Sequence, residues 1–297
     1  MSEDLRRPPA LAWTFRLALF SLLFLLCVRF LNAASLFPRM PQNTGEFSFR
    51  AGKLRDVREI RFEATDGTGL YGWLCGAQRA RHRILFCSGN GGNAALNGER
   101  MAQVAAALDA QVLVFDYRGY YLSEGHPSEE GLYQDVRGAW LYAHSELGWP
   151  AGQSVIWGHS LGAAVALALA ADLHESEERR ATLFGAQAPG ARALILESPF
   201  SSVADMARHR MGFLGLAHWL VYARLDNLSR AKGAALPALV LHGTADEIIP
   251  AEMGRRVQAA LPQSPPGIWL EGGRHNTLWS SHRQEMTQAI KQFLGAN

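Results

Sequence analysis

The segment Gly158-His159-Ser160-Leu161-Gly162 determines how the rest of this 297-residue chain is interpreted. It matches the pattern G-x-S-x-G, in which a nucleophilic serine occupies a sharp turn between a strand and a helix. Residues 154–157 before it have strand character, and the Ala- and Leu-rich residues 163–173 after it favour a helix. Glycines on both sides suit a strained turn that packs closely against its neighbours. The segment therefore predicts a nucleophilic serine; the alternative is a buried strand–helix junction with an ordinary N-cap serine.

The composition is that of a globular α/β protein with a large core. Hydrophobic residues make up 48% of the chain and charged residues 19%, which argues against disorder. The net charge of +2 comes without a dense basic cluster or a nucleic-acid-binding signature, so we expect no nucleic-acid partner. The cysteines Cys27, Cys75 and Cys87 lack metal-ligand spacing, and we expect neither a metal nor an organic cofactor.

The N-terminal region is strongly apolar from Ala10 to Leu31. Its uninterrupted core, Leu17 to Val28, is 12 residues long, whereas a bilayer span needs roughly 20. Arg16 and Arg29 lie near the two ends, where long basic side chains can reach the membrane interface. A transmembrane anchor, a cleaved signal peptide and a buried helix are the three interpretations.

We interpret residues 1–35 as a single-pass N-terminal membrane anchor whose orientation is open, because basic residues flank both of its ends. Asn32-Ala33-Ala34 is a poor cleavage site, although secretion or periplasmic release after cleavage is the alternative. Residues 36–56 contain prolines and glycines and are expected to form an irregular linker.

Residues 57–297 alternate between strand and helix patterns and are predicted to form one catalytic domain. A hairpin at 59–75 comes first, and the later strands are near-continuous apolar runs, as in a parallel sheet covered on both faces. The further predicted strands are 83–87, 112–115, 154–157, 193–197, 238–241 and 267–270, and the predicted helices are 94–108, 130–147, 163–173, 251–261 and 278–294. The pattern predicts a mostly parallel central sheet with helices on both faces and an antiparallel N-terminal edge.

Residues 198–235 interrupt this alternation. The segment is rich in methionine, leucine and aromatic residues with basic residues between them. We expect a helical lid insert over the site, with apolar side chains that suit an acyl chain; ordinary packing of an amphipathic helix is the alternative.

A nucleophilic serine needs a base, and the base needs a third group to orient it. Asp246 follows the predicted strand that ends at Leu241, and His275 follows the one that ends at Leu270. Sites in open α/β sheets form at the carboxyl ends of the strands, so Ser160, Asp246 and His275 are predicted to converge as a catalytic triad. Taken singly, Asp246 could instead be a turn or N-cap residue, and His275 a solvated turn residue.

Other acids and histidines are weaker candidates for the triad. Asp205 and Asp226 could serve as the acid, but they fall in the irregular insert. His242 ends its strand too early to be the base, and His159 is held beside Ser160 with its side chain expected to point elsewhere.

Acyl transfer also needs donors for the developing oxyanion, each worth about 3 kcal/mol. We assign one oxyanion-hole donor to the backbone N–H of Leu161, which follows the nucleophile. The second is the backbone N–H of Asn90, or that of Gly91, in the glycine-rich loop after the third predicted strand. A phosphate-binding loop is excluded there, because the Lys-Ser/Thr pair of such loops is absent.

The chain resembles the α/β-hydrolase superfamily, and within it the N-terminally membrane-anchored α/β-hydrolase-domain-containing serine hydrolases. The segments that carry the resemblance are Ser88–Asn93, Asp116–Tyr120, Ser123–Gly125, Gly158–Gly162, Glu197–Phe200, His242–Asp246 with Pro250, and His275-Asn276. In that group the oxyanion loop usually opens with His-Gly-Asn, and Ser88 stands here in place of the histidine. The resemblance implies ester or thioester hydrolysis and favours an uncleaved anchor.

These patterns predict a serine hydrolase that cleaves carboxylic ester or thioester bonds of a small-molecule or lipid acyl substrate. A serine peptidase of aminopeptidase type could use the same triad on the same fold. A catalytically silent binding module is the non-enzymatic alternative.

Overall fold

The computed structural model describes residues 56–91, 94–185, 188–212 and 223–296, together with residues 19, 36 and 37. Within these ranges, no helix combines the length and the apolar character needed to cross a bilayer. Apart from Leu19, the apolar stretch proposed as an anchor lies outside the described residues, and so do residues 213–222 of the predicted lid.

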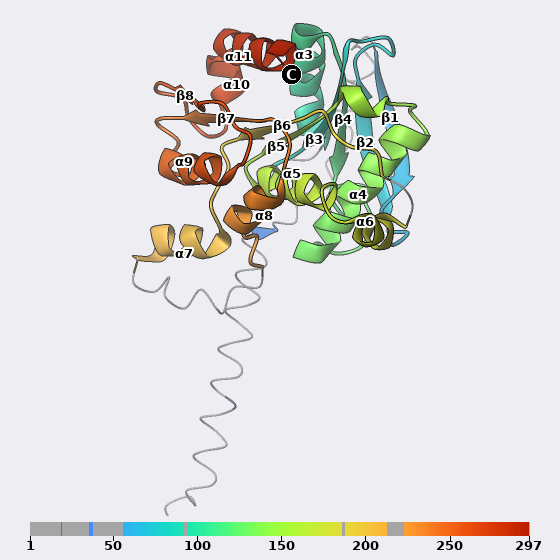
Figure 1. Ribbon diagram of the computed structural model, residues 1–297, viewed down its shortest axis with the longest axis horizontal. Helices are drawn as coiled ribbons and strands as arrows, with labels where there is room; N and C mark the ends of the chain where they lie inside the picture. Colours follow the sequence, from blue (N-terminus) through green and yellow to red (C-terminus); the bar gives the residue numbers. More distant parts are fainter. Residues whose placement is uncertain are drawn as a thin grey trace, which may run out of the picture.

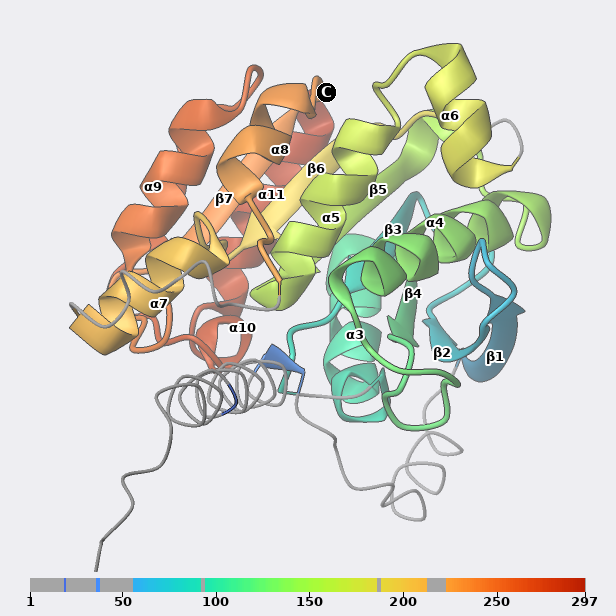
Figure 2. The same ribbon diagram turned by 90° about the horizontal axis from the view of Figure 1, so that it is seen from below.

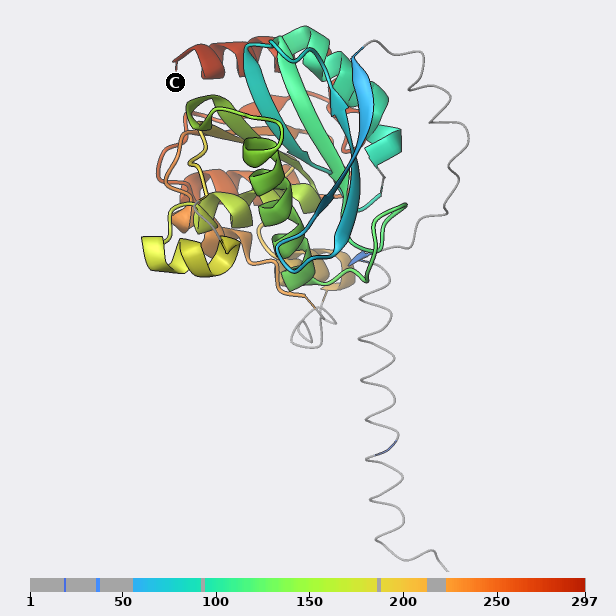
Figure 3. The ribbon, with the colours of Figure 1, turned by 90° about the vertical axis from the view of Figure 1, so that its right-hand side faces the viewer.

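An eight-stranded sheet forms the centre of the described structure (Figure 1). Its strands are β1 (Val57–Glu63), β2 (Gly69–Cys75), β3 (His82–Cys87), β4 (Ala110–Asp116), β5 (Ser154–His159), β6 (Ala193–Glu197), β7 (Ala238–Gly243) and β8 (Ile268–Leu270), arranged in the order β1-β2-β4-β3-β5-β6-β7-β8. β2 runs antiparallel to β1 and β4, and every pairing from β4 to β8 is parallel. The antiparallel hairpin lies at the edge that faces the viewer in Figure 3. The predicted mostly parallel sheet with an antiparallel N-terminal edge is confirmed.

Helices cover both faces of the sheet (Figure 2), so the predicted layers are also confirmed. The described helices are α3 (Ala94–Leu108), α4 (Glu129–Ser145), α5 (Leu161–Asp172), α6 (Glu177–Phe184), α7 (Val203–Met211), α8 (Asn227–Gly233), α9 (Ala251–Ala260), α10 (Leu278–Ser281) and α11 (Arg283–Ala296). α4, α5, α8 and α9 enclose one core against the sheet, while α3, α10 and α11 enclose the other. β4 and β5 lie between the two layers and are almost wholly buried, which explains why their sequences are apolar without alternation.

Two segments differ from the elements expected of the sequence. The polar connection at 172–190 contains α6, which Ser176 caps by accepting a hydrogen bond from the Arg179 N–H and which Gly185 ends in the left-handed conformation. The single helix expected at 278–294 is divided into α10 and α11 at His282, whose Nε2 lies 3.0 Å from the carbonyl oxygen of Glu271. Specific hydrogen bonds therefore accompany the ends of α6 and the division between α10 and α11, which the hydrophobic pattern does not predict.

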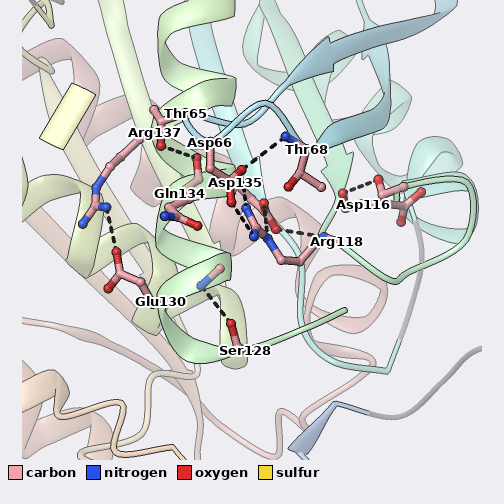
Figure 4. Close-up of polar contacts among 12 residues, drawn as sticks. Thr65, Asp66, Thr68, Asp116, Arg118, Ser128, Glu130, Gln134, Asp135 and Arg137 are labelled. Atoms are coloured by element: carbon pink, nitrogen blue, oxygen red, sulfur yellow. Dashed lines mark hydrogen bonds and ion pairs between the residues drawn. The ribbon is translucent and has the colours of Figure 1, made fainter. Parts of the chain in front are cut away.

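Arg118 joins the exit of β4 to the β1–β2 turn and to α4 (Figure 4). Its backbone N–H and Nε each donate to the buried Asp135 carboxylate at 2.8 Å, and its two terminal nitrogens donate to Asp66 at 2.8 and 3.0 Å. The hydrogen bonds from Arg118 lower the pKa of Asp66 to about 2.

Ser123 also holds the chain where it leaves β4. Its hydroxyl donates to the Asp116 carbonyl at 2.7 Å and accepts the Tyr71 N–H at 3.0 Å. The 116–125 motif thus fixes the chain next to the loop that follows β3.

Candidate active site

Ser160 occupies a strained turn between β5 and α5. Its φ of 55° and ψ of −117° lie outside the regions that non-glycine residues prefer. A Cβ at Gly158 would overlap the Gly162 carbonyl, and a Cβ at Gly162 would overlap the Cys87 carbonyl of β3. Both glycines are therefore required by close backbone approach, and the turn presents the Ser160 side chain at the carboxyl edge of the sheet.

The structure brings Ser160, His275 and Asp246 together from the ends of three strands. His275 Nε2 lies 3.0 Å from Ser160 Oγ, and His275 Nδ1 lies 2.7 Å from Asp246 Oδ2. Ser160 and His275 are 9% and 3% exposed, and the Asp246 side chain is fully buried. The three groups form one continuous hydrogen-bond chain between β5, β7 and β8.

Asp246 is held as a charged carboxylate by several donors. Oδ1 accepts the backbone N–H groups of Ile248 and Ile249 at 3.0 and 2.8 Å, which is the turn role considered as an alternative for this residue. Oδ2 faces His275 Nδ1 and, at 3.3 Å, His242 Nε2. Burial by itself would raise the pKa of Asp246, but these hydrogen bonds and the nearby imidazole hold it well below its usual range. The turn and the contact with His275 use different oxygens, so one carboxylate performs both roles.

The loop after β3 borders Ser160. A Cβ at Gly89 would lie 3.4 Å from the Cβ of Ser160, which places the loop directly beside the turn. Tyr117 donates its hydroxyl proton to the Ser88 carbonyl at 2.9 Å, and Asn90 Nδ2 donates to the Leu36 carbonyl at 3.2 Å. The loop is thereby tied to the β4 exit and to the chain that precedes the domain.

Ser88 has its own partner at the position where the resembled group has histidine. Its hydroxyl accepts a hydrogen bond from Asn97 Nδ2 of α3 at 3.3 Å. Asp116 accepts the N–H of Ala94, the first residue of the same helix, at 2.6 Å. These contacts fix the start of α3 relative to the 88–91 loop. The Ser88 hydroxyl therefore still connects the loop to α3, although it is smaller than a histidine ring.

A buried ion pair lies behind the Ser160 turn. Arg100 of α3 contacts the 1%-exposed Glu197 carboxylate at 2.5 Å, and Trp157 Nε1 donates to the same oxygen at 3.1 Å. The Glu197 backbone carbonyl accepts the Ser160 N–H at 2.9 Å. Burial raises the pKa of Glu197, but the Arg100 guanidinium and the Trp157 N–H outweigh it and bring the pKa below its usual value. The pair connects α3, β5 and β6 directly beneath Ser160.

His159 lies beside the His275 ring. Its ring centre is 5.1 Å from that of His275, and it packs against Gly89. Burial lowers the pKa of His159 to about 4, so this ring is neutral at neutral pH. An uncharged ring therefore lies next to His275.

The competing acids have other partners. Asp226 caps α8 by accepting the Ser229 N–H at 3.2 Å. Asp205 pairs with Arg256 at 2.9 Å and accepts the Ser201 hydroxyl at 2.5 Å. Both carboxylates are engaged by groups of the 198–235 insert and α9, while Asp246 is the acid that faces the His275 ring.

Three residues contact the site although no site role was predicted for them: His242, Glu247 and Tyr117. Glu247 accepts the backbone N–H of His275 at 3.3 Å, and its position directly after Asp246 was the one available signal. His242 was considered only as a base, whereas its ring nitrogen Nε2 lies 3.3 Å from Asp246 Oδ2. The described residues include no group of three or more His, Cys, Asp or Glu side chains placed to hold a metal ion.

The sheet order and the serine turn define a class of protein, and comparisons with known proteins agree with it. The family model for the alpha/beta hydrolase fold matches residues 82–209. A Mycobacterium tuberculosis protein named as uncharacterized is 34% identical over 241 residues, covering 80% of this chain and 79% of the relative. This chain therefore belongs to the α/β-hydrolase superfamily.

More distant proteins share the same framework. Human alpha/beta hydrolase domain-containing protein 17B is 25% identical over 217 residues, covering 72% of this chain and 68% of the relative. The solved structure of the Pyrococcus furiosus esterase Pf2001 superposes with a TM-score of 0.63 at 17% identity, covering 88% of this chain and 97% of that chain. At that identity the likeness establishes the fold.

Proposed function

We propose that the protein is a serine hydrolase that cleaves carboxylic ester or thioester bonds of acyl substrates through a covalent acyl-enzyme. The observation that carries this proposal is the continuous hydrogen-bond chain from Ser160 through His275 to Asp246, with its distances of 3.0 and 2.7 Å. The name of the similar P. furiosus structure, an esterase, agrees with this reaction class.

In the proposed mechanism, Ser160 Oγ attacks the acyl carbonyl while His275 Nε2 takes its proton. His275 returns that proton to the leaving oxygen or sulfur as the bond to the acyl carbon breaks. Water then enters, His275 takes a proton from it, and the resulting hydroxide equivalent attacks the acyl-serine. The acid leaves as the proton returns to Ser160, so the enzyme is regenerated with one water consumed. Asp246 keeps the imidazole oriented and stabilises its charged form.

We assign the oxyanion hole to the backbone N–H groups of Leu161 and Asn90. Leu161 is the first residue of α5, where backbone N–H groups have no partner within the helix. The position of Gly89 against Ser160 supports Asn90, because its N–H belongs to the next residue of the same loop. Removal of one such donor typically costs about 3 kcal/mol of transition-state stabilisation.

We further propose that residues 1–35 anchor the protein in a membrane and that the catalytic edge faces the bilayer. Phe37 is 4% exposed and packs into the core, and the Leu36 carbonyl accepts the Asn90 amide of the oxyanion loop. Leu31, the last residue of the apolar stretch, is five residues from Leu36 and so at most about 18 Å away. An anchored chain would hold Ser160 near acyl chains in the bilayer, which favours a lipid or acylated substrate.

The anchor is tested by extraction of membranes that contain the full chain with alkaline carbonate. We expect the unmodified chain to stay with the membrane and the Leu23→Arg/Leu26→Arg variant to be released. Release of both at the same rate would remove the anchor, and with it the argument for a bilayer substrate.

The reaction class is tested with p-nitrophenyl acyl esters of rising chain length and matched aminoacyl p-nitroanilides. We expect ester cleavage, reduced roughly 10⁴-fold or more by Ser160→Ala. Preferential cleavage of the anilides would identify a peptidase. A protein inert towards both series, and towards a thioester series, would be the silent binding module.

A further inference from the structure

A second imidazole contacts the carboxylate of the triad. His242, near the end of β7 and four residues before Asp246, has a fully buried side chain. Its Nε2 lies 2.9 Å from the Ile249 carbonyl oxygen and 3.3 Å from Asp246 Oδ2. A carbonyl oxygen can only accept a hydrogen bond, so Nε2 must carry a hydrogen.

The Nε2–H donates to the Ile249 carbonyl, and Asp246 Oδ2 lies 3.3 Å from the same nitrogen, close to its partial positive charge. Oδ2 therefore lies near two ring nitrogens, the other being His275 Nδ1 at 2.7 Å. A displacement of Oδ2 away from His242 would change the direction of the bond that orients His275.

Packing prevents the His242 ring from rotating. A Cβ at Gly254 of α9 would overlap His242 Nδ1, so the ring edge lies directly against the helix backbone. On the β8 side, the Trp269 ring centre is 6.2 Å from that of His242, and the Arg255 guanidinium lies 4.5 Å from the Trp269 centre on that ring. Asp246 is the charged group in hydrogen-bonding range of the ring, while Glu252, Arg255 and Arg256 belong to the packed helix and Glu197 to β6.

We infer that His242 is a positioning residue of the triad, whose Nε2–H holds Asp246 Oδ2 in the orientation that aligns His275 with Ser160. The inference rests on the proposed serine hydrolase function. The ring's hydrogen-bonding nitrogen contacts Asp246 and the Ile249 carbonyl and not the nucleophile, so His242 acts on the reaction only through Asp246.

The decisive comparison is between His242→Leu and His242→Gln. Leucine fills a similar volume without a donor, whereas the glutamine Nε2 can reach the Ile249 carbonyl and Asp246. We expect His242→Leu to lower kcat by about 10- to 100-fold, the usual effect of losing a hydrogen bond to a charged group. KM should stay unchanged, and His242→Gln should recover most of the rate.

The pH profile distinguishes positioning from a merely structural role. Without the Nε2–H, Asp246 carries a less neutralised charge and binds the protonated form of the His275 ring more strongly. The acid limb of kcat/KM should therefore move to higher pH in His242→Leu and return in His242→Gln. A lower melting temperature with an unmoved acid limb and unchanged kcat would show that His242 only packs, and would overturn the inference.

Two further variants keep the test informative if His242→Leu does not fold. Gly254→Ala introduces a better helix former but pushes on Nδ1, so it should lower kcat in the same direction without altering His242 itself. His82→Gln changes a buried histidine at the amino-terminal end of the central strand β3 and should leave kcat and the profile unchanged. A folded Gly254→Ala variant with full kcat and an unmoved acid limb would overturn the inference.

A fluorophosphonate probe separates failure of this inference from failure of the proposed function. If unmodified protein does not label at Ser160, the hydrolase proposal is wrong. If it labels and the His242 variants label at the same rate with the same pH profile, the hydrolase proposal stands and the role of His242 is wrong.

Discussion

Two buried aspartates at the carboxyl edge of the sheet have opposite surroundings. Asp246 accepts hydrogen bonds from two backbone N–H groups and contacts two imidazoles. Asp116, at the end of β4, accepts the Ala94 N–H at 2.6 Å, and its Oδ2 is buried without a hydrogen-bond partner among the described residues. The two carboxylates are both buried and differ in the number of hydrogen-bond donors around them.

The protonation states follow from this difference. Burial raises the pKa of Asp116 to about 8, because the single Ala94 N–H does not compensate for lost hydration. The donors around Asp246 hold its pKa well below the usual range even though its side chain is also buried. The fold thus keeps a proton on the carboxylate that holds the start of α3 and a charge on the one that faces His275.

Asp246→Asn should have the largest effect. An amide keeps the volume but loses the charge and presents a donor where His275 needs an acceptor, so kcat should fall by about 10⁴-fold. Steady-state kinetics on an acyl ester would measure this. Asp226→Asn is the matched control, since that carboxylate caps α8 and should leave kcat unchanged. Equal losses in both variants would mean that Asp246 supports the fold and not the chemistry.

Arg100→Met should have the next largest effect, on stability. Glu197 is another buried carboxylate, and the Arg100 guanidinium is its ion-pair partner. Removing one partner of a buried pair typically costs about 3 to 5 kcal/mol. Urea unfolding should show this loss, and adding Glu197→Gln should restore part of it. No loss in the single variant would show that solvent reaches Glu197.

Asp116→Asn should change how stability depends on pH. The folded state keeps the Asp116 proton up to about pH 8, whereas the unfolded chain releases it near 3.8, so unfolding releases a proton between these values. Stability of the unmodified protein should therefore fall as pH rises from about 4 to about 8. The amide of the variant has no proton to lose, so the variant should lack this part of the slope. Melting temperatures at about pH 5 and about pH 8 test the sign, and parallel profiles would mean that Asp116 is charged in the fold.

The sequence supported the sheet, the serine turn and the meeting of Ser160, Asp246 and His275 because each depends on local pattern and topology. Apolar runs marked the strands, and residues that follow parallel strands meet at one edge. The donors around Asp246 were harder to predict. His242 reaches Asp246 only because the 246–249 turn brings the Ile249 carbonyl back to the ring.

The hydrophobic pattern of the sequence could not predict long-range ion pairs or exact helix boundaries. Arg100 and Glu197 are 97 residues apart, and nothing local to either residue indicates the other. α6 has a polar sequence, and only its capping residues indicate a helix. The last predicted helix is divided at His282, whose ring contacts the Glu271 carbonyl. These features depend on specific hydrogen bonds, which hydrophobic periodicity does not encode.

The central claim, that Ser160 is the nucleophile of an acyl-transfer site, is tested most directly by mapping the residue that a fluorophosphonate modifies. Peptide mass spectrometry should find the adduct on Ser160, with labelling lost in Ser160→Ala and strongly slowed in His275→Ala. An adduct on another residue, or undiminished labelling of Ser160→Ala, would contradict the account.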